Sequence, residues 1–338
     1  MELREASFYE KLAEGVVHCG LCSQHCRIKP GAVGICGVRR NDGGTLRTLV
    51  YGRSIAQAVD PIEKKPLFHF LPGTTSFSIA TPGCNFRCRH CQNADISQMP
   101  HDRGVVAGEE LAPAEVVSRA RAAGCASIAY TYTEPTIFFE YAFDTAVLAR
   151  EAGLRNVFVS NGYTSAAALT AIAPYLDAAN IDLKSSRDDF YKRICGARLD
   201  PVLETLRLYR RLGIWIEVTT LVIPGENDAE EDLAGCARFV AEELGRSVPW
   251  HVSAFHPTYR LLDRPRTPAA TLRRARQIGL AAGLHHVYEG NLPGEGEETA
   301  CPVCGHGVIE RVGYEVTNNR LRDGRCPDCN AAVAGVWV

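Results

Sequence analysis

Residues 77–93, FSIATPGCNFRCRHCQN, join a short apolar strand directly to a loop that carries three cysteines. Cys84, Cys88 and Cys91 have the spacing CxxxCxxC, so each thiolate can reach a different iron of a [4Fe-4S] cubane and leave the fourth iron without a protein ligand. S-adenosylmethionine (SAM) can chelate that iron through its amino and carboxylate groups. An electron from the cluster then breaks the sulfonium bond and gives a 5'-deoxyadenosyl radical. The loop therefore predicts a radical-generating site.

A zinc site is the alternative for this loop. Structural zinc prefers four protein ligands, and no fourth cysteine lies nearby in the sequence, although His90 could complete the set. The loop follows a strand of the predicted core and is not part of an isolated hairpin. Three ligands at this place favour the open cluster.

Residues 77–291 repeat one unit, in which a short apolar run rich in β-branched residues is followed by a polar break and a helical pattern. The apolar runs begin at Phe77, Ser127, Asn156, Ala179, Trp215, Trp250 and His285. Such runs are typical of buried parallel strands, and many of the helical patterns close on glycine, as helix C-termini do. Six or seven strands are fewer than the eight of a closed barrel, so we expect a partial (β/α) barrel with right-handed crossovers. Its chemistry should lie at the carboxyl ends of the strands.

The composition limits the expected partners. The 338 residues are 46% hydrophobic and 22% charged, which is ordinary for a globular protein, and a net charge of −2 gives no electrostatic case for nucleic-acid binding. Residues 1–15, MELREASFYEKLAEG, predict a short polar helix without the apolar core of a signal peptide, and no apolar run is long enough to span a bilayer. We expect a cytoplasmic protein without membrane or nucleic-acid partners.

Fourteen cysteines are many for this length, and clustered cysteines in a reducing compartment favour metal sites over disulfides. Eleven of them are clustered, in the loop and in two groups of four. Cys125, Cys195 and Cys236 stand alone in apolar or helical context and are predicted to be buried structural thiols. No accessory cysteine is expected near the loop, which makes methyl-transferring or sulfur-inserting reactions less attractive.

The first group of four lies in HCGLCSQHCRIKPGAVGICG, residues 18–37. Its members are Cys19, Cys22, Cys26 and Cys36. The spacing CxxCx3Cx9C, among glycine, proline and polar residues, predicts a tight four-thiolate cage. Zinc is narrowly favoured as a closed structural solution, while an iron–sulfur cluster accepts the same ligands. Zinc would fasten a cap over the barrel, whereas a cluster would relay electrons.

The second group of four forms two CPxC knuckles separated by a strand-like segment. Its members are Cys301, Cys304, Cys326 and Cys329. The pattern is typical of a zinc ribbon or a rubredoxin-like site, in which backbone amides point at the thiolate sulfurs. Zinc suits an appended module better than iron, which would make the module an electron carrier. The segment lacks a dense basic face, so we expect it to serve stability or docking.

Several stretches together resemble a known family. CNFRCRHCQN resembles the radical SAM superfamily, and DPIEKKPLFHFLPG, YTYTEP, SNGY, NIDLKS and SAFHPTY resemble the radical SAM component of the AmmeMemoRadiSam system, relatives of the pyruvate formate-lyase activating enzyme. The resemblance covers nearly the whole chain. It implies a (β/α)6-type barrel at residues 73–294, between an N-terminal module and cap at 1–72 and a C-terminal ribbon at 295–338. It also implies AMMECR-like and Memo-like partners and a reductant such as flavodoxin or ferredoxin.

The resemblance places SAM contacts at two strand ends. Thr133 and Glu134 lie where the superfamily's second-strand motif binds the SAM amino group, although no Gly-Gly-Glu is present. The alternative for Glu134 is a favourable position near the N-terminus of the helix that opens at Pro135. Ser160 and Asn161 lie where the superfamily contacts the ribose or carboxylate of SAM, or they form a plain strand-to-helix turn.

Later strands add further candidates. Asp182 and Lys184 are ionised groups in an apolar strand and must be partnered. The resemblance puts this Asp-Leu-Lys beside SAM, with Asp182 helping to hold a monovalent cation, and a buried structural ion pair is the alternative. It also puts the backbone of residues 222–224 against adenine. His256 is a candidate contact for SAM or substrate, although a lone histidine is more often a satisfied core residue.

These features predict an enzyme whose adenosyl radical abstracts hydrogen from a protein, a peptide or a small molecule. The first alternative is a glycyl-radical enzyme activase. The second is a non-enzymatic zinc or iron scaffold or an electron-transfer protein, which would use four ligands where the loop offers three.

Overall fold

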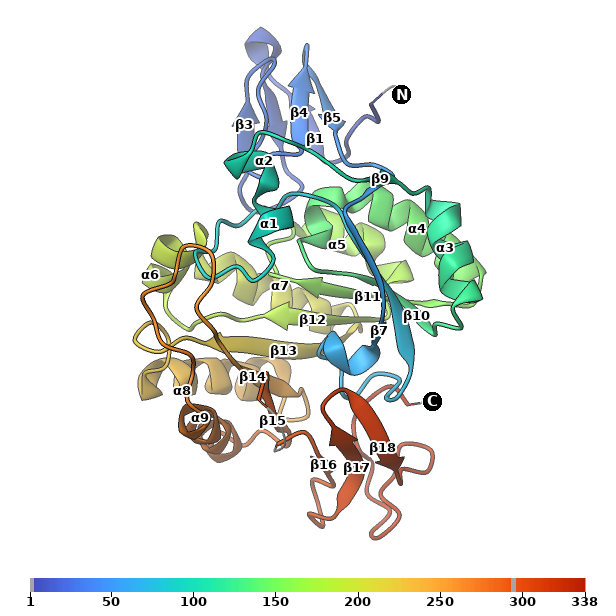
Figure 1. Cartoon of the computed structure of the whole chain (residues 1–338), viewed down its shortest axis with the longest axis vertical. Helices are drawn as coiled ribbons and strands as arrows, with labels where there is room; N and C mark the ends of the chain where they lie inside the picture. The colour runs from blue at the N-terminus through green and yellow to red at the C-terminus, as the bar shows by residue number, and fades with distance from the viewer. Residues whose placement is uncertain (1–2, 293–295, 338) are drawn as a thin grey trace.

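The computed structural model describes residues 3–292 and 296–337. An N-terminal module of short strands lies at one end of the molecule, the large sheet and its helices occupy the middle, and a small C-terminal ribbon lies at the other end (Figure 1). The predicted boundary between residues 294 and 295 lies outside the described residues. Within the described part of the chain, no helix is both long and apolar enough to cross a membrane.

The central sheet contains every strand that the apolar runs predict. Its order is β15 (Val287–Gly290), β14 (Trp250–Ala254), β13 (Trp215–Val222), β12 (Ala178–Asp182), β11 (Arg155–Ser160), β10 (Ser127–Tyr130), β8 (Thr75–Ala80) and β7 (Ala56–Pro61). Neighbours from β8 to β15 are parallel, and β7 adds an antiparallel edge that the sequence analysis did not predict. Among the described residues, β15 and β7 end the sheet without pairing with each other. The predicted partial barrel is confirmed.

Helices cover the outer face of this sheet and form the main core with it. The longer ones are α3 (Pro113–Ala122), α4 (Phe139–Glu151), α5 (Ala166–Ile172), α7 (Leu199–Arg211), α8 (Glu230–Arg238) and α9 (Ala269–Ala281). A smaller core fills the inner face, where Ile62, Leu67 and Phe70 pack against residues of β10, β11 and β12. Each fully buried side chain of this kind contributes about 1.5–3 kcal/mol. Residues 62–70 therefore plug one end of the barrel and leave the other end for a site.

The N-terminal module is built from short strands. They are β1 (Tyr9–Lys11), β2 (Val17–Cys19), β3 (Cys26–Ile28), β4 (Arg39–Asp42) and β5 (Thr45–Thr48), with a 3-10 turn, η1 (Ala13–Gly15). The prediction of a helix over residues 1–15 is wrong for the described part. Phe8 and Glu14 have φ angles of 56° and 57°, which no right-handed helix tolerates, and β1 pairs instead with β2.

The C-terminal ribbon is an antiparallel sheet of β16 (Thr299–Ala300), β17 (Gly307–Val312) and β18 (Glu315–Asn319). Arg311 of β17 donates a hydrogen bond of 2.7 Å to the carbonyl of Phe68, and the His69 ring hydrogen-bonds the carbonyl of Ala334 at 2.7 Å. The ribbon thus docks on the segment that plugs the barrel.

Short elements complete the described chain. They are β6 (Arg53–Ser54), η2 (Ile62–Lys64), α1 (Ala94–Ser97), α2 (Met99–Asp102), β9 (Glu109–Glu110), η3 (Pro135–Phe138), η4 (Ala173–Tyr175), α6 (Asp188–Phe190), the π-helix η5 (Tyr191–Cys195) and the π-helix η6 (Phe239–Leu244).

Candidate functional site

The three-cysteine loop lies at the carboxyl end of β8, before α1. Its backbone is fixed by protein contacts, because the N–H groups of Arg87 and Arg89 donate to the carbonyls of Cys195 and Ile194 at 2.8 and 2.9 Å. The side chain of Gln98 also donates to the carbonyl of Phe86 at 3.1 Å. The loop therefore holds its shape through the chain's own hydrogen bonds.

The three loop sulfurs are close, but not close enough for one ion. Burial raises the pKa of Cys84 and of Cys91, and the neighbouring loop thiols add to both shifts, so the sulfurs interact with one another. Two thiolates on one zinc, each about 2.3 Å from it, lie at most about 4.6 Å apart. Within the described residues, Cys84, Cys88 and Cys91 do not form a set of ligand atoms that all lie within 4.8 Å. Thiolates on separate irons of a cubane need this wider spacing.

Two polar atoms of the loop are buried without a partner among the described residues. They are Nδ2 of Asn85 and Nδ1 of His90. Burial lowers the pKa of His90 to about 3, so its ring is neutral. Because buried polar atoms almost always have a partner, these two fit a polar group bound at the loop.

Cys195 is buried, as predicted, but it lies beside the loop, which the sequence did not indicate. Cys88, His90 and Cys195 have ligand atoms within 4.8 Å of one another, and a hydrogen bond with Cys195 lowers the pKa of Cys88. The expectation of no accessory cysteine near the loop is therefore wrong. No sequence signal joins the two, because the contact depends on how η5 meets the loop backbone. Cys125 and Cys236 are buried, as predicted.

Glu134 joins the ends of β10 and β11. Its carboxylate is fully buried, which raises its pKa, and it accepts hydrogen bonds from Thr136 N (3.0 Å), Thr136 Oγ1 (2.6 Å), Ser160 Oγ (2.9 Å) and Asn161 N (2.8 Å). The Thr136 contacts cap η3, which is the structural alternative for this residue. Among the described residues, Oε2 accepts a hydrogen bond only from Asn161, so it can accept another donor. Thr133, one residue earlier, donates to the carbonyl of Thr81 at 2.9 Å.

The end of β11 contacts the loop directly. Nδ2 of Asn161 donates to Oδ1 of Asn85 at 2.7 Å and lies 3.8 Å from Sγ of Cys84. Ser160 is buried and is tied to Glu134 by the bond given above. Ser160 and Asn161 therefore connect Glu134 to the three-cysteine loop through hydrogen bonds.

Asp182 and Lys184 form the expected ion pair at the end of β12, with 2.8 Å between Lys184 Nζ and Asp182 Oδ2. Burial by itself lowers the pKa of Lys184, but Asp182 and the sulfurs of Cys88 and Cys195 outweigh it and raise the pKa. The pair therefore lies beside the loop sulfurs and places a positive charge next to them.

The remaining candidates from the sequence are the backbone of residues 222–224 and the side chain of His256. Val222 and Ile223 are buried, and Asn227 Oδ1 accepts from the Ile223 N–H at 2.6 Å. His256 is exposed at the rim, with its Nδ1 3.5 Å from the side-chain nitrogen of Gln92, next to Cys91 in the sequence.

A buried charged cluster inside the barrel escaped the sequence analysis. Asp60 pairs with Lys65 at 2.6 Å and accepts from Ser78 at 2.9 Å and from the Tyr132 hydroxyl. Burial lowers the pKa of Lys65 to about 8. Tyr132 has a φ of 62°, a strained conformation for a bulky residue, and directly precedes Thr133. In the sequence, the charged residues of DPIEKKP beside an apolar segment were the signal that could have indicated this cluster.

The two groups of four cysteines differ in spacing. In the ribbon all four sulfurs lie within 4.8 Å, with 3.6 Å for Cys301–Cys329 and for Cys304–Cys326. This is close to the roughly 3.8 Å between thiolates on a tetrahedral zinc ion. Within the described residues, no three members of the N-terminal group meet the same limit. The metal site predicted for that group stays a prediction.

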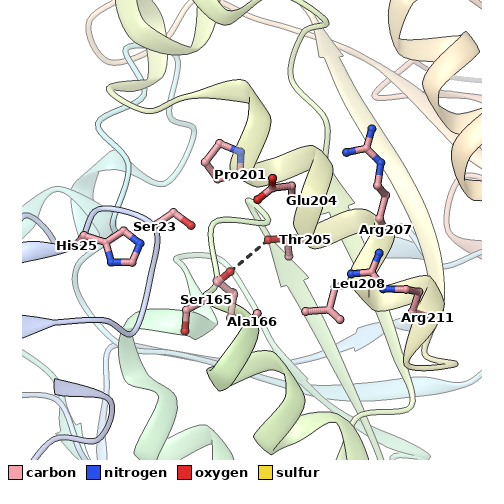
Figure 2. Close-up of a pocket in the computed structure, with 11 residues that line it drawn as sticks. Ser23, His25, Ser165, Ala166, Pro201, Glu204, Thr205, Arg207, Leu208 and Arg211 are labelled. Atoms are coloured by element: carbon pink, nitrogen blue, oxygen red, sulfur yellow. Dashed lines mark hydrogen bonds between the residues drawn. The ribbon is translucent and has the colours of Figure 1, made fainter. Parts of the chain in front are cut away.

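A cavity of about 500 Å³ lies between the N-terminal module and α7 (Figure 2). It is lined by polar residues of both parts, including Ser23, His25, Ser165, Glu204 and Arg207. No residue of the three-cysteine loop lines it. The cavity is therefore separate from the candidate site.

Comparisons with known proteins agree with this geometry. Residues 78–237 match the family described as the Radical SAM superfamily. An uncharacterized protein of Methanocaldococcus jannaschii is 48% identical over 334 residues, which are 98% of this chain and 99% of that protein. The isethionate sulfite-lyase activating enzyme of Nitratidesulfovibrio vulgaris is 36% identical over 135 residues, which are 38% of this chain and 43% of that enzyme. The match thus spans less than half of the activating enzyme.

One solved structure shows the same fold. The radical SAM methyltransferase from Sphaerobacter thermophilus superposes with a TM-score of 0.51 at 17% identity, over 66% of this chain and 68% of that one. At this identity the likeness concerns the fold alone.

Proposed function

Because the chain belongs to the radical SAM superfamily, we propose that Cys84, Cys88 and Cys91 hold a [4Fe-4S] cluster at which SAM binds and is reductively cleaved. When bound, the cluster and SAM supply a 5'-deoxyadenosyl radical that abstracts hydrogen from a substrate. The observation that carries the proposal is the spacing of the loop sulfurs, which interact with one another but are too widely spaced as a set for one ion.

The surrounding residues have defined roles in this proposal. The carbonyls of Ile194 and Cys195 keep the loop in shape, and Lys184 offsets the negative charge of the thiolates. Asp182 pairs with Lys184, and a monovalent cation near Asp182 stays a prediction. We place SAM towards β10, β11 and β12, where Oε2 of Glu134 retains accepting capacity for an amino group.

Anaerobic reconstitution with iron and sulfide, followed by dithionite and SAM, tests the proposal through 5'-deoxyadenosine. We expect Cys88→Ala to lose the loop cluster and the product, and the matched Cys125→Ala, a buried cysteine elsewhere, to retain both. Product from Cys88→Ala at the unchanged rate would reject the ligand assignment.

A glycyl-radical enzyme activase is the second candidate, supported by the similarity to the isethionate sulfite-lyase activating enzyme. A flavodoxin or ferredoxin is the reductant that we propose in either case, and AMMECR-like and Memo-like proteins are the proposed system partners. Incubation of the loaded enzyme and SAM with each partner, followed by electron paramagnetic resonance, tests this. A radical on a glycine of the partner supports the activase, and a partner without radical signal opposes it.

We also propose zinc for the ribbon, because the 3.6 Å sulfur separations match a tetrahedral ion.

A further inference from the structure

The N-terminal quartet, defined as Cys19, Cys22, Cys26 and Cys36, surrounds a common space. Cys19 and Cys26 are direct partners across β2 and β3, and the N–H of Ile35, next to Cys36, donates to Sγ of Cys26 at 3.5 Å. Within the described residues, however, no three of its sulfurs lie within 4.8 Å of one another. The quartet, like the three-cysteine loop and unlike the ribbon, therefore does not meet the limit for a single ion.

Backbone amides point at these sulfurs. The N–H of Ile35 lies 3.5 Å from Sγ of Cys26 in a hydrogen bond. The N–H groups of Gln24 and Val38 donate to the sulfurs of Cys22 and Cys36. Such amide–sulfur bonds stabilise thiolates and tune the metal group that they hold.

Three of the four cysteines of the quartet, Cys19, Cys22 and Cys36, are buried, and Cys26 is partly exposed. Apolar side chains of the module, among them Leu21 and Val38, belong to the same core as the barrel helices. The guanidinium of Arg39 is also buried in this part of the module, where it pairs with Glu140 of α4 at 3.0 Å.

The quartet also packs directly against the three-cysteine loop. The side chain of Gln24 donates to the carbonyl of Asn85 at 2.7 Å. The carbonyl of Cys36 lies only 2.9 Å from where a Cβ would stand at Gly83, the residue before Cys84. The first contact joins Gln24, two residues from Cys22 and from Cys26, to Asn85, and the second joins Cys36 itself to Gly83, so both reach a direct neighbour of Cys84.

We propose that the N-terminal quartet binds an iron–sulfur cluster and not zinc. Four cysteines that the pairing of β2 with β3 and the following turn bring together, but whose sulfurs exceed the reach of a single ion, fit a polynuclear group, whose irons each take their own thiolate. The cluster places a one-electron centre directly behind the loop. The proposal concerns these four cysteines alone and does not depend on what the loop does with SAM.

The experiment uses the full chain with Cys84, Cys88 and Cys91 all replaced by alanine, so that iron at the loop cannot contribute. After anaerobic reconstitution we expect about four iron and about one zinc per chain, and an iron–sulfur signal in electron paramagnetic resonance after dithionite. Adding Cys36→Ala should remove the iron and the signal, while adding Cys125→Ala should leave both. About two zinc ions per chain and no iron in the triple variant would overturn the proposal.

The zinc of the ribbon distinguishes misfolding from the loss of a single cysteine ligand, because it reports whether the rest of the chain is intact. A Cys36→Ala background that keeps about one zinc has lost the quartet's iron specifically. Mössbauer spectra of the unaltered protein give a second measurement that needs no variant. Iron from two sites supports the proposal, and iron equal to one cubane opposes it.

Discussion

The N-terminal module and the ribbon each present four cysteines and each dock on the barrel through a buried arginine–glutamate pair, but they dock at different places. Arg39 of the first pairs with Glu140 of α4 at 3.0 Å, and Arg311 of the second lies 3.6 Å from Glu63 beside the barrel plug. The module against the three-cysteine loop has the wide sulfur spacing, and the module away from it has the single-ion spacing. Two groups of four cysteines thus differ in whether their sulfurs lie close enough for a single ion.

The largest contrast should follow from removing one cysteine of the ribbon. Structural zinc contributes about 10–16 kcal/mol of apparent binding free energy in small domains, so we expect Cys326→Ala to unfold the ribbon and lose its zinc while the iron content stays constant. Limited proteolysis with metal analysis measures this. Iron loss from Cys326→Ala would show that the two modules are not independent.

The docking pairs should differ in strength. Arg39→Met leaves Glu140, with a side chain only 3% exposed, without its cation, and we expect a loss of about 3–5 kcal/mol in the free energy of unfolding. Arg311→Met should cost less, roughly 1–3 kcal/mol, because burial already raises the pKa of Glu63 and the carboxyl can take a proton. Urea unfolding measures both, with the exposed Arg121→Met as control. Equal losses of unfolding free energy in the two variants would show that the two docking pairs do not differ in strength.

Gly83→Ala tests the contact between the quartet and the loop. A Cβ there would meet Val38 Cγ1 at 2.7 Å and Cys36 O at 2.9 Å, at a φ of +102°. We expect a loss of roughly 3 kcal/mol or more and a lower iron content in the quartet. Gly124→Ala is the matched control, since its φ is +67° with no atom within 4 Å, and should cost about 1–2 kcal/mol from strain alone. Similar losses in the two variants would argue against a tight contact.

The smallest effect is the pH dependence of ribbon docking. Burial raises the pKa of Glu63 above its unfolded value of about 4.3. Its contribution is therefore fully present below about pH 4.3 and is lost as the pH rises through the raised pKa. We expect the melting temperature of the zinc-loaded protein to fall with rising pH more steeply than that of Glu63→Gln. If the melting temperatures of the two proteins fall equally with pH, titratable groups other than Glu63 cause the pH dependence.

The strands of the barrel could be predicted because each is a continuous apolar run with helical patterns on either side. The loop cysteines and the ion pair of Asp182 and Lys184 could be named from spacing and from charge in an apolar strand. Nothing local marks Cys195 as a neighbour of Cys88, because that contact is made by the backbone of η5. The strands of the N-terminal module were missed because they are short and gain their partners from distant residues.

The spacing of the sulfurs also could not be predicted from the sequence. CxxCx3Cx9C and two CPxC knuckles both supply four thiolates, and only the folded backbone decides how far apart these stand. For Glu134 the sequence left two alternatives, a helix cap and a contact with SAM. The hydrogen bonds from Thr136 show that Glu134 caps η3. Its Oε2 accepts from Asn161 and can accept another donor, so the contact with SAM stays a prediction.

The pairing of Arg39 with Glu140 bears on the order in which the protein is made. The two residues are 101 positions apart, so at synthesis rates of about 5–20 residues per second the module waits roughly 5–20 s on the ribosome for its docking surface. The ribbon emerges last, when the segment that receives it is already complete. The quartet's thiols are thus the first of the chain's cysteines to emerge and spend that interval without the core that later buries them, which makes them the point at which oxidants have the earliest access to the nascent protein.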